Sequence, residues 1–196
     1  MPKYIAFINT ETNGLHKHQK FNVSIKNLYM WARLVKLQYH IGYREEDTGK
    51  FVLTKKVEKL VKPHHFLITE SASKINGITT EKAEKKGEDI KDVLWQFKND
   101  MKNVSIVVSH NLPFHLKTLQ AEMLRWVTVV DFNNHILIDT IDFFHKLEYP
   151  KLKALSKEIL GKDYQSKSRK YNIVIIRKLF LKLYEMFEKN VSQTEV

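Results

Sequence analysis

The sequence contains no cysteine and no long hydrophobic run, and both absences narrow the classes of protein to which it can belong. Without cysteine the chain can form neither disulfide bonds nor a cysteine-ligated zinc site, which agrees with a cytoplasmic protein. No apolar run approaches the roughly 20 residues that a membrane-spanning helix needs, and the N-terminus lacks the charged-then-apolar pattern of a signal peptide. We therefore expect a cytoplasmic protein with no membrane partner.

Acidic residues are also scarce relative to basic ones. There are 22 Asp and Glu against 33 Lys and Arg, which gives a net charge of +11 and a pI near 9.6. A domain this basic commonly binds polyanions, and nucleic acid is the usual one, although a lysine-rich surface without a specific partner is the alternative. The length of 196 residues with 43% hydrophobic content fits one globular domain, which we expect over residues 1–188, with a frayed tail at 189–196.

Short apolar runs alternate with amphipathic segments, and this order predicts an α/β fold with a central mixed β-sheet flanked by helices. The basic segment at residues 15–29 has no period, and we expect it to be a loop in which His16 and His18 are solvated. Thr79 is a candidate N-cap and Gly161 a candidate C-cap. The expected strands are 4–8, 32–43, 51–61, 104–109 and 136–140, with a turn at 45–50, and the expected helices are 88–102, the segment after His110, 151–160 and 169–188.

The first strand ends in Asn9-Thr10-Glu11-Thr12-Asn13-Gly14-Leu15. Asn9 and Glu11 are two residues apart, so an extended backbone directs both side chains to one face. An ordinary polar strand end explains these residues as well as a metal site at the sheet edge does. The stretch resembles the first motif of the DEDD family of 3′–5′ exonucleases, Asp-x-Glu-Thr-Thr-Gly-Leu, most closely the proofreading epsilon-subunit type. The resemblance implies an RNase H-like fold, and it places the amide of Asn9 where the family has its first metal-binding carboxylate.

Two further motifs of this family have counterparts in the same order, so the resemblance covers essentially the whole chain. The segment from His110 to His115 resembles the second motif, His-Asn-x-x-Phe-Asp, with His115 in place of the aspartate. The third motif, His-x-Ala-x-x-Asp, corresponds to residues 167–172, where Lys167 replaces the histidine and Asn172 the aspartate. Asn76 likewise replaces a histidine in the segment that usually reads His-Gly-Ile-Thr.

The resemblance implies a chemistry that these replacements would remove. Similar enzymes hold two Mg²⁺ or Mn²⁺ ions with four carboxylates, and their third-motif histidine helps to deprotonate the attacking water. Glu11 is the only acid retained at the four positions, and an amide supplies no charge to a hard cation. Lys167 cannot take a proton from water near neutral pH unless its pKa is strongly lowered. We therefore expect no bound cofactor, or at most one weakly held ion between Glu11 and His115.

The same replacements favour metal-independent binding of phosphate, because they remove negative charge and add lysine. In similar enzymes these motifs hold the end of the nucleic-acid strand. Phe114 in the core, or His110 and Asn111 as a helix cap, would be ordinary structural alternatives. The expected nucleic-acid contacts are Thr12, Asn13, Gly14, Leu15, His110, Asn111, Phe114, Lys167 and Arg169.

Three functions are compatible with the sequence. The first is a degenerate exonuclease-fold protein that binds nucleic acid, in particular single-stranded ends, through a basic cleft in DNA replication or repair. The second is an interaction module that binds a polymerase or belongs to a larger replication or viral assembly. The third is a residual nuclease that uses Glu11 and His115, with Asp139 or another nearby acid, around one metal.

Overall fold

The computed structural model describes residues 3–17, 20–142, 151–161 and 172–194. In these residues, no helix is both long and apolar enough to cross a membrane. The elements in chain order are β1 (Tyr4–Thr12), the 3₁₀ helix η1 (Ile25–Met30), β2 (Leu34–Arg44), β3 (Phe51–Leu60), α1 (Glu70–Asn76), α2 (Thr80–Lys86), α3 (Ile90–Met101), β4 (Val104–Ser109), α4 (Leu112–Arg125), the 3₁₀ helix η2 (Phe132–Asn134), β5 (Ile136–Asp139), α5 (Leu152–Leu160) and α6 (Asn172–Thr194).

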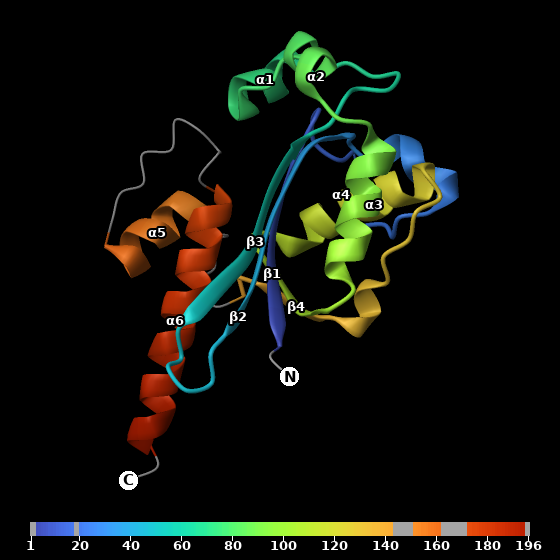
Figure 1. The fold of residues 1–196 in the computed structure, drawn as a ribbon. Coiled ribbons are helices and arrows are strands. Elements are labelled where there is room, and N and C mark those ends of the chain that lie inside the picture. The colour runs from blue at the N-terminus through green and yellow to red at the C-terminus, as the bar shows by residue number, and fades with distance from the viewer. Residues whose placement is uncertain (1–2, 18–19, 143–150, 162–171, 195–196) are drawn as a thin grey trace.

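The five strands form one mixed sheet in the order β3-β2-β1-β4-β5. β1 and β2 pair antiparallel, as do β2 and β3, whereas β4 pairs parallel with both β1 and β5. Helices α3 and α4 cover one face, α5 and α6 lie on the other, and α1 and α2 sit beyond the end of the sheet at which β1 ends (Figure 1). This arrangement confirms the predicted α/β fold with a mixed sheet flanked by helices.

Alternation along β1 divides the core between the two faces of the sheet. Ala6 and Ile8 are fully buried in the cluster that contains the apolar residues of α3 and α4. Ile5 and Phe7 point the other way and pack with Ile173, Ile176 and Phe180 of α6. Asn9 and Glu11 follow Ile5 and Phe7 at the same two-residue spacing, so their side chains lie on the face of the sheet that α6 covers.

Most predicted elements are confirmed where the local pattern is strong. The hairpin, α3, β4 and α5 lie within a few residues of their expected bounds. Thr79 caps α2 by accepting a hydrogen bond from the Lys82 backbone N–H, and Gly161 ends α5 with a φ of 62°. A six-residue 3₁₀ helix, η1, replaces part of the loop expected at 15–29.

One expectation is wrong, because His16 is buried rather than solvated. Helix α6 runs to Thr194, and the tail expected at 189–196 stays a prediction. The expected start of this helix at Arg169 lies outside the described residues, and the domain bounds at 1–188 stay a prediction.

Candidate functional site

The end of β1 carries Asn9 and Glu11 on one face, as predicted. Both side chains are buried, and the Asn9 amide donates to Glu11 Oε1 at 3.5 Å and to Gln38 Oε1 of β2 at 3.2 Å. An amide between these two oxygens stabilises the carboxylate without adding negative charge. The position therefore works as a hydrogen-bond donor in the folded chain.

The polar contacts continue across the sheet from Asn9 to the edge strand. Gln38 donates through Nε2 to Glu58 of β3 at 3.1 Å, and the Lys36 ammonium lies 3.6 Å from the same carboxylate. Lys36 is also the residue of β2 that stands opposite Glu11 in the strand register. We call Asn9, Glu11, Lys36, Gln38 and Glu58 the polar strip. It places a lysine beside the retained acid on the face where similar enzymes bind cations.

His40 and Arg177 lie where α6 meets this strip. Arg177 Nη1 of α6 is 3.5 Å from His40 Nδ1. Burial lowers the pKa of His40 to about 4, and the positive charges of Arg177 and Lys56 act in the same direction. His40 is therefore neutral near pH 7, and it adds no charge to the strip.

His115 is buried in the first turns of α4, and both of its ring nitrogens have partners. Its Nδ1 accepts the Thr10 backbone N–H at 3.0 Å and lies 2.8 Å from the Thr10 hydroxyl, while Nε2 lies 3.1 Å from the His110 carbonyl oxygen. Because Nδ1 accepts the hydrogen bond from the Thr10 N–H, it carries no hydrogen itself, and the Nε2–H donates to the His110 carbonyl. This neutral ring joins α4 to β1, and it could ligate a metal only after breaking one of these bonds.

Asp139 holds the N-terminus of α4. Its carboxylate accepts the backbone N–H groups of Asn111 at 2.9 Å, Leu112 at 2.8 Å and Ile141 at 3.0 Å. The Asn111 side chain makes no capping bond, although its backbone adopts a left-handed conformation with a φ of 65°. Asn111 thus occupies the N-cap position, but the capping hydrogen bonds come from Asp139, 28 positions further along the chain.

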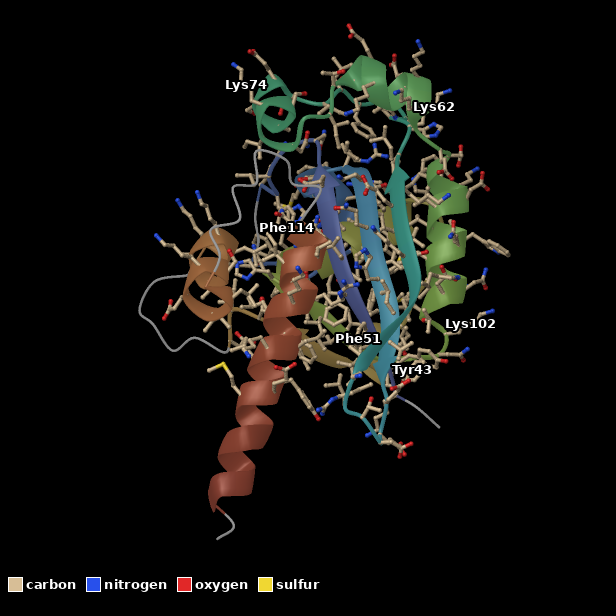
Figure 2. The ribbon with its side chains drawn as sticks, turned by 60° about the vertical axis from the view of Figure 1, so that its left-hand side comes forward. Tyr43, Phe51, Lys62, Lys74, Lys102 and Phe114 are labelled. Atoms are coloured by element: carbon tan, nitrogen blue, oxygen red, sulfur yellow. The ribbon has the colours of Figure 1, made fainter. Side chains whose placement is uncertain are left out.

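Of the third-motif positions 167–172, the structure describes Asn172 alone. Asn172 is the first residue of α6 and is half-buried, whereas Lys167 and Arg169 lie outside the described residues. Within the described part of the chain, no three His, Asp or Glu side chains are grouped so that they could hold a metal ion. Phe114 lies near the end of the sheet where β1 ends and α6 begins, opposite the end that carries Tyr43 and Phe51 (Figure 2).

The turn after β1 is fixed by hydrogen bonds, and its last residue projects into solvent. Asn13 accepts the Arg33 backbone N–H at 2.8 Å, the Thr12 hydroxyl donates to the Gly14 carbonyl at 2.6 Å, and Asn76 donates to the Thr12 carbonyl at 3.3 Å. Leu15 is 82% exposed. Thus one ordered turn with an apolar tip contains four of the residues that are expected to contact nucleic acid, Thr12, Asn13, Gly14 and Leu15.

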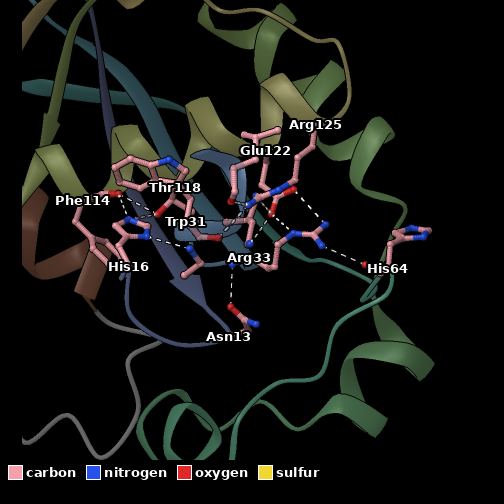
Figure 3. Close-up of polar contacts among 12 residues, drawn as sticks. Asn13, His16, Trp31, Arg33, His64, Phe114, Thr118, Glu122 and Arg125 are labelled. Atoms are coloured by element: carbon pink, nitrogen blue, oxygen red, sulfur yellow. Dashed lines mark hydrogen bonds and ion pairs between the residues drawn. The ribbon is translucent and has the colours of Figure 1, made fainter. Parts of the chain in front are cut away.

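No pattern in the sequence indicates that His16 supports Phe114. The His16 ring stacks on Phe114 at a centroid distance of 4.3 Å, and its Nδ1 accepts the Ala32 backbone N–H at 3.1 Å (Figure 3). Its Nε2 lies 3.2 Å from the Thr118 hydroxyl. Burial lowers the pKa of His16, and the positive charges of Lys117 and Arg125 act in the same direction. A neutral histidine therefore joins the first motif to the second.

A buried carboxylate, Glu122 of α4, is a second residue that the sequence did not reveal. It accepts bonds from Arg33 Nε at 2.8 Å, Arg125 Nη1 at 3.0 Å and the Leu34 backbone N–H at 3.0 Å (Figure 3). Arg125 in turn donates to the carbonyls of Leu28 and Trp31 at 2.6 and 2.9 Å. We call Glu122, Arg33 and Arg125 the buried triad, which holds η1 and the start of β2 against α4.

A protein-family model for exonucleases, RNase_T, matches residues 41–166. The chain belongs to this exonuclease family. The match contains the second motif and begins after the first, and together with the fold it places the chain among the DEDD-type 3′–5′ exonucleases. A search of curated proteins found no match.

Solved structures share the fold of this exonuclease-family chain at low sequence identity. Exonuclease I from E. coli in complex with a dT13 oligonucleotide matches with a TM-score of 0.72 and 13% identity, over 98% of this chain and 43% of that one. The zinc-bound form of an E. coli ExoI–ssDNA complex matches with a TM-score of 0.68 and 14% identity, over 94% and 41%. An ExoI/SSB-Ct complex matches with a TM-score of 0.66 and 15% identity, over 94% and 43%. The chain therefore spans less than half the length of the exonuclease I chains it matches.

Proposed function

We propose that this exonuclease-family domain no longer hydrolyses nucleic acid by the two-metal reaction and instead binds it, in particular at single-stranded ends. The observation that carries the proposal is the set of side chains at the four motif positions, which are Asn9, Glu11, His115 and Asn172. One acid is present where active relatives have four. The amide of Asn9 donates to Glu11, and His115 bonds to Thr10 and His110.

Electrostatics explains why one acid is too few. Two unit charges about 4 Å apart interact by roughly 4 kcal/mol at an effective dielectric constant of about 20, and each missing carboxylate would have faced divalent ions. Magnesium and manganese prefer anionic oxygen ligands, which amides and imidazole do not replace. Lys36, which stands opposite Glu11, is 3.6 Å from Glu58 and offsets its negative charge, so Glu58 does not make up for the missing carboxylates. The proposed site therefore has no bound cofactor.

Three observations support nucleic acid as the ligand. The chain carries a net charge of +11, which favours contact with phosphate groups. Structures with the same fold are complexes of exonuclease I with oligonucleotides. The ordered turn from Thr12 to Leu15 and the half-buried ring of Phe114 are the features to which we assign the terminal nucleotide, with a base stacked on the side of the ring that His16 does not cover. We place this role in the cytoplasm, in DNA replication or repair.

The proposal is tested with a 3′-labelled single-stranded oligonucleotide, with chelator or with Mg²⁺ or Mn²⁺. We expect binding without metal, a steep loss of affinity as salt rises, and no shortening of the oligonucleotide. Affinity that is the same at low and moderate salt would contradict a phosphate-based interface. Metal-dependent shortening that Glu11→Gln abolishes would instead establish the residual nuclease.

A protein partner is the second candidate function. The ExoI/SSB-Ct complex is the observation that favours it, because a protein with this fold is described there in complex with another protein's segment. A partner that binds the purified chain equally well with and without a saturating oligonucleotide would identify an interaction module.

A further inference from the structure

Segment 15–30 carries exposed aromatic and basic side chains on the outside of α4. Tyr29 of η1 is 72% exposed and Phe21 is 53% exposed. The Lys17 ammonium lies 5.9 Å from the centroid of the Tyr29 ring, and Lys20 and Lys26 are exposed on the same segment. We call Lys17, Lys20, Phe21, Lys26 and Tyr29 the lysine–aromatic face. Exposed apolar side chains that are grouped on one segment, rather than scattered singly, are typical of contact surfaces.

Acidic residues are absent from the chain around this face. Residues 12–44 contain no Asp or Glu, and neither do residues 101–121, which include most of α4. The next acid of α4 is Glu122, which is 1% exposed and bonded to two arginines. The two segments therefore contribute positive charge and no negative charge of their own to this surface, which suits a polyanion.

A cavity adjoins this face between segment 22–23 and α4. Its volume is about 320 Å³, and its walls include Val23, Lys117 and Met123. This volume lies at the lower end of the range of small-ligand pockets, about 300–1,000 Å³. A recess with apolar walls and a lysine can receive a flat, unstacked ring whose phosphate stays outside.

The lysine–aromatic face is held in a fixed position relative to the turn after β1. The Lys17 backbone N–H donates to the Met30 carbonyl at 2.9 Å, and Arg125 of the buried triad donates to the Leu28 and Trp31 carbonyls on either side. His16 connects the same segment to Ala32 and Thr118. Tyr29 is thus presented by an ordered backbone, which lowers the entropy cost of binding.

We propose that the lysine–aromatic face is a second contact surface for single-stranded nucleic acid, where a base stacks on Tyr29 and the lysines contact phosphates. The inference rests on the proposed function, since it extends the path of the strand beyond the turn at Thr12–Leu15. Stacking requires bases that are not paired, so the ligand is a single strand. An acidic peptide would use the lysines but would gain little from an exposed aromatic face.

The test compares two lengths of labelled oligothymidine by fluorescence anisotropy. One has about 16 nucleotides and can span both surfaces, and the other has about 4 and fills only one. Tyr29→Ala is expected to weaken binding of the longer oligonucleotide about tenfold and to leave the shorter one unchanged, while Tyr29→Phe keeps wild-type affinity. Replacing Lys17, Lys20 and Lys26 together by Gln should reduce the slope of log affinity against log salt by about one per lost phosphate contact.

Matched controls separate this effect from a general surface effect. Trp95 of α3 is 68% exposed on a helix that contains Asp92 and Asp100, and Trp95→Ala should leave both affinities unchanged. Lys74→Gln on α1 is the control for the lysine replacements, because Lys74 is already paired with Glu70 at 2.6 Å.

Each other outcome overturns the inference. Equal effects of Tyr29→Ala and Trp95→Ala would show that Tyr29 has no special role, and equal losses for both lengths would place Tyr29 in the end-binding site. Competition by polyglutamate that depends on Tyr29 would identify an acidic peptide as the ligand. If the wild-type chain binds neither oligonucleotide, the proposed function fails together with this inference.

Discussion

Replacing Glu122 should destabilise the fold more than any other single removal of a charge in the described residues. Its carboxylate is 1% exposed and accepts four hydrogen bonds, two from Arg33, one from Arg125 and one from the Leu34 backbone. Glu122→Gln keeps an oxygen acceptor but leaves two largely buried guanidinium groups without their counter-ion. Removing one partner of a buried ion pair costs about 3–5 kcal/mol, chiefly because the remaining charge is unpaired.

The assay is equilibrium unfolding in urea. The free energy of unfolding falls by about 1–3 kcal/mol per molar urea, so we expect the urea concentration at the midpoint of unfolding to fall by roughly 2 M. The melting temperature should fall by about 10 °C, since 1 kcal/mol corresponds to about 2–4 °C in a domain of this size. Glu70→Gln is the matched control, because Glu70 forms an exposed pair with Lys74 that is worth about 0.3–0.5 kcal/mol.

A double-mutant cycle with Arg125→Met tests the physical reason. Removing one arginine lowers the number of unpaired buried charges, so the loss in Glu122→Gln/Arg125→Met should be smaller than the sum of the two single losses. Additive losses, or a Glu122→Gln midpoint equal to that of Glu70→Gln, would refute the description of the triad as a coupled buried cluster.

Three further predictions follow from single residues. Asp139→Asn should cost about 1–2 kcal/mol in urea unfolding, because it removes charge from the carboxylate that caps α4; an unchanged midpoint would contradict this role. Gly42→Ala should lower the melting temperature by several degrees, because an added Cβ would collide with the Val52 carbonyl and the Phe51 ring, while Gly14→Ala has open space and should be neutral. The folded-state pKa of His40, about 4, lies below the value of about 6.5 expected when unfolded, so the unfolded chain binds the extra proton between these values. Stability should therefore fall as pH drops from about 6.5 towards 4, and His40→Gln should make that fall shallower in urea midpoints measured across the range.

Sequence reasoning succeeded where neighbours along the chain decide the structure. The period of the apolar residues identified α3, and the spacing of Asn9 and Glu11 placed them on one face of β1. Capping by Thr79 and Gly161 is likewise local, since each depends on the conformation of one residue and the helix beside it. Such features need no knowledge of the rest of the fold.

Contacts between segments that are far apart in the sequence were not predicted. His16 is buried because Phe114 and Thr118, 98 and 102 positions away, pack against its ring. The segment around His16 is basic and polar in composition, which predicted a solvated loop. Glu122 lies in an ordinary amphipathic helix, and nothing in that helix indicates that Arg33, 89 positions away, would pair with it. Whether a polar side chain can be buried depends on such partners, and the partners are known only from the three-dimensional arrangement of the strands.

The position of β1 at the centre of the sheet has a consequence for the order of folding. Asn9 of this strand bonds to a residue of β2 that is 29 positions away, whereas Ile8 bonds to a residue of β4 that is 101 positions away. Closing the longer loop costs more entropy, so we expect the three N-terminal strands to associate first and the C-terminal half to dock afterwards. The turn at Thr12–Leu15, which is bonded to Arg33 and Asn76 of the N-terminal half, would then form before α4 places Phe114 against His16.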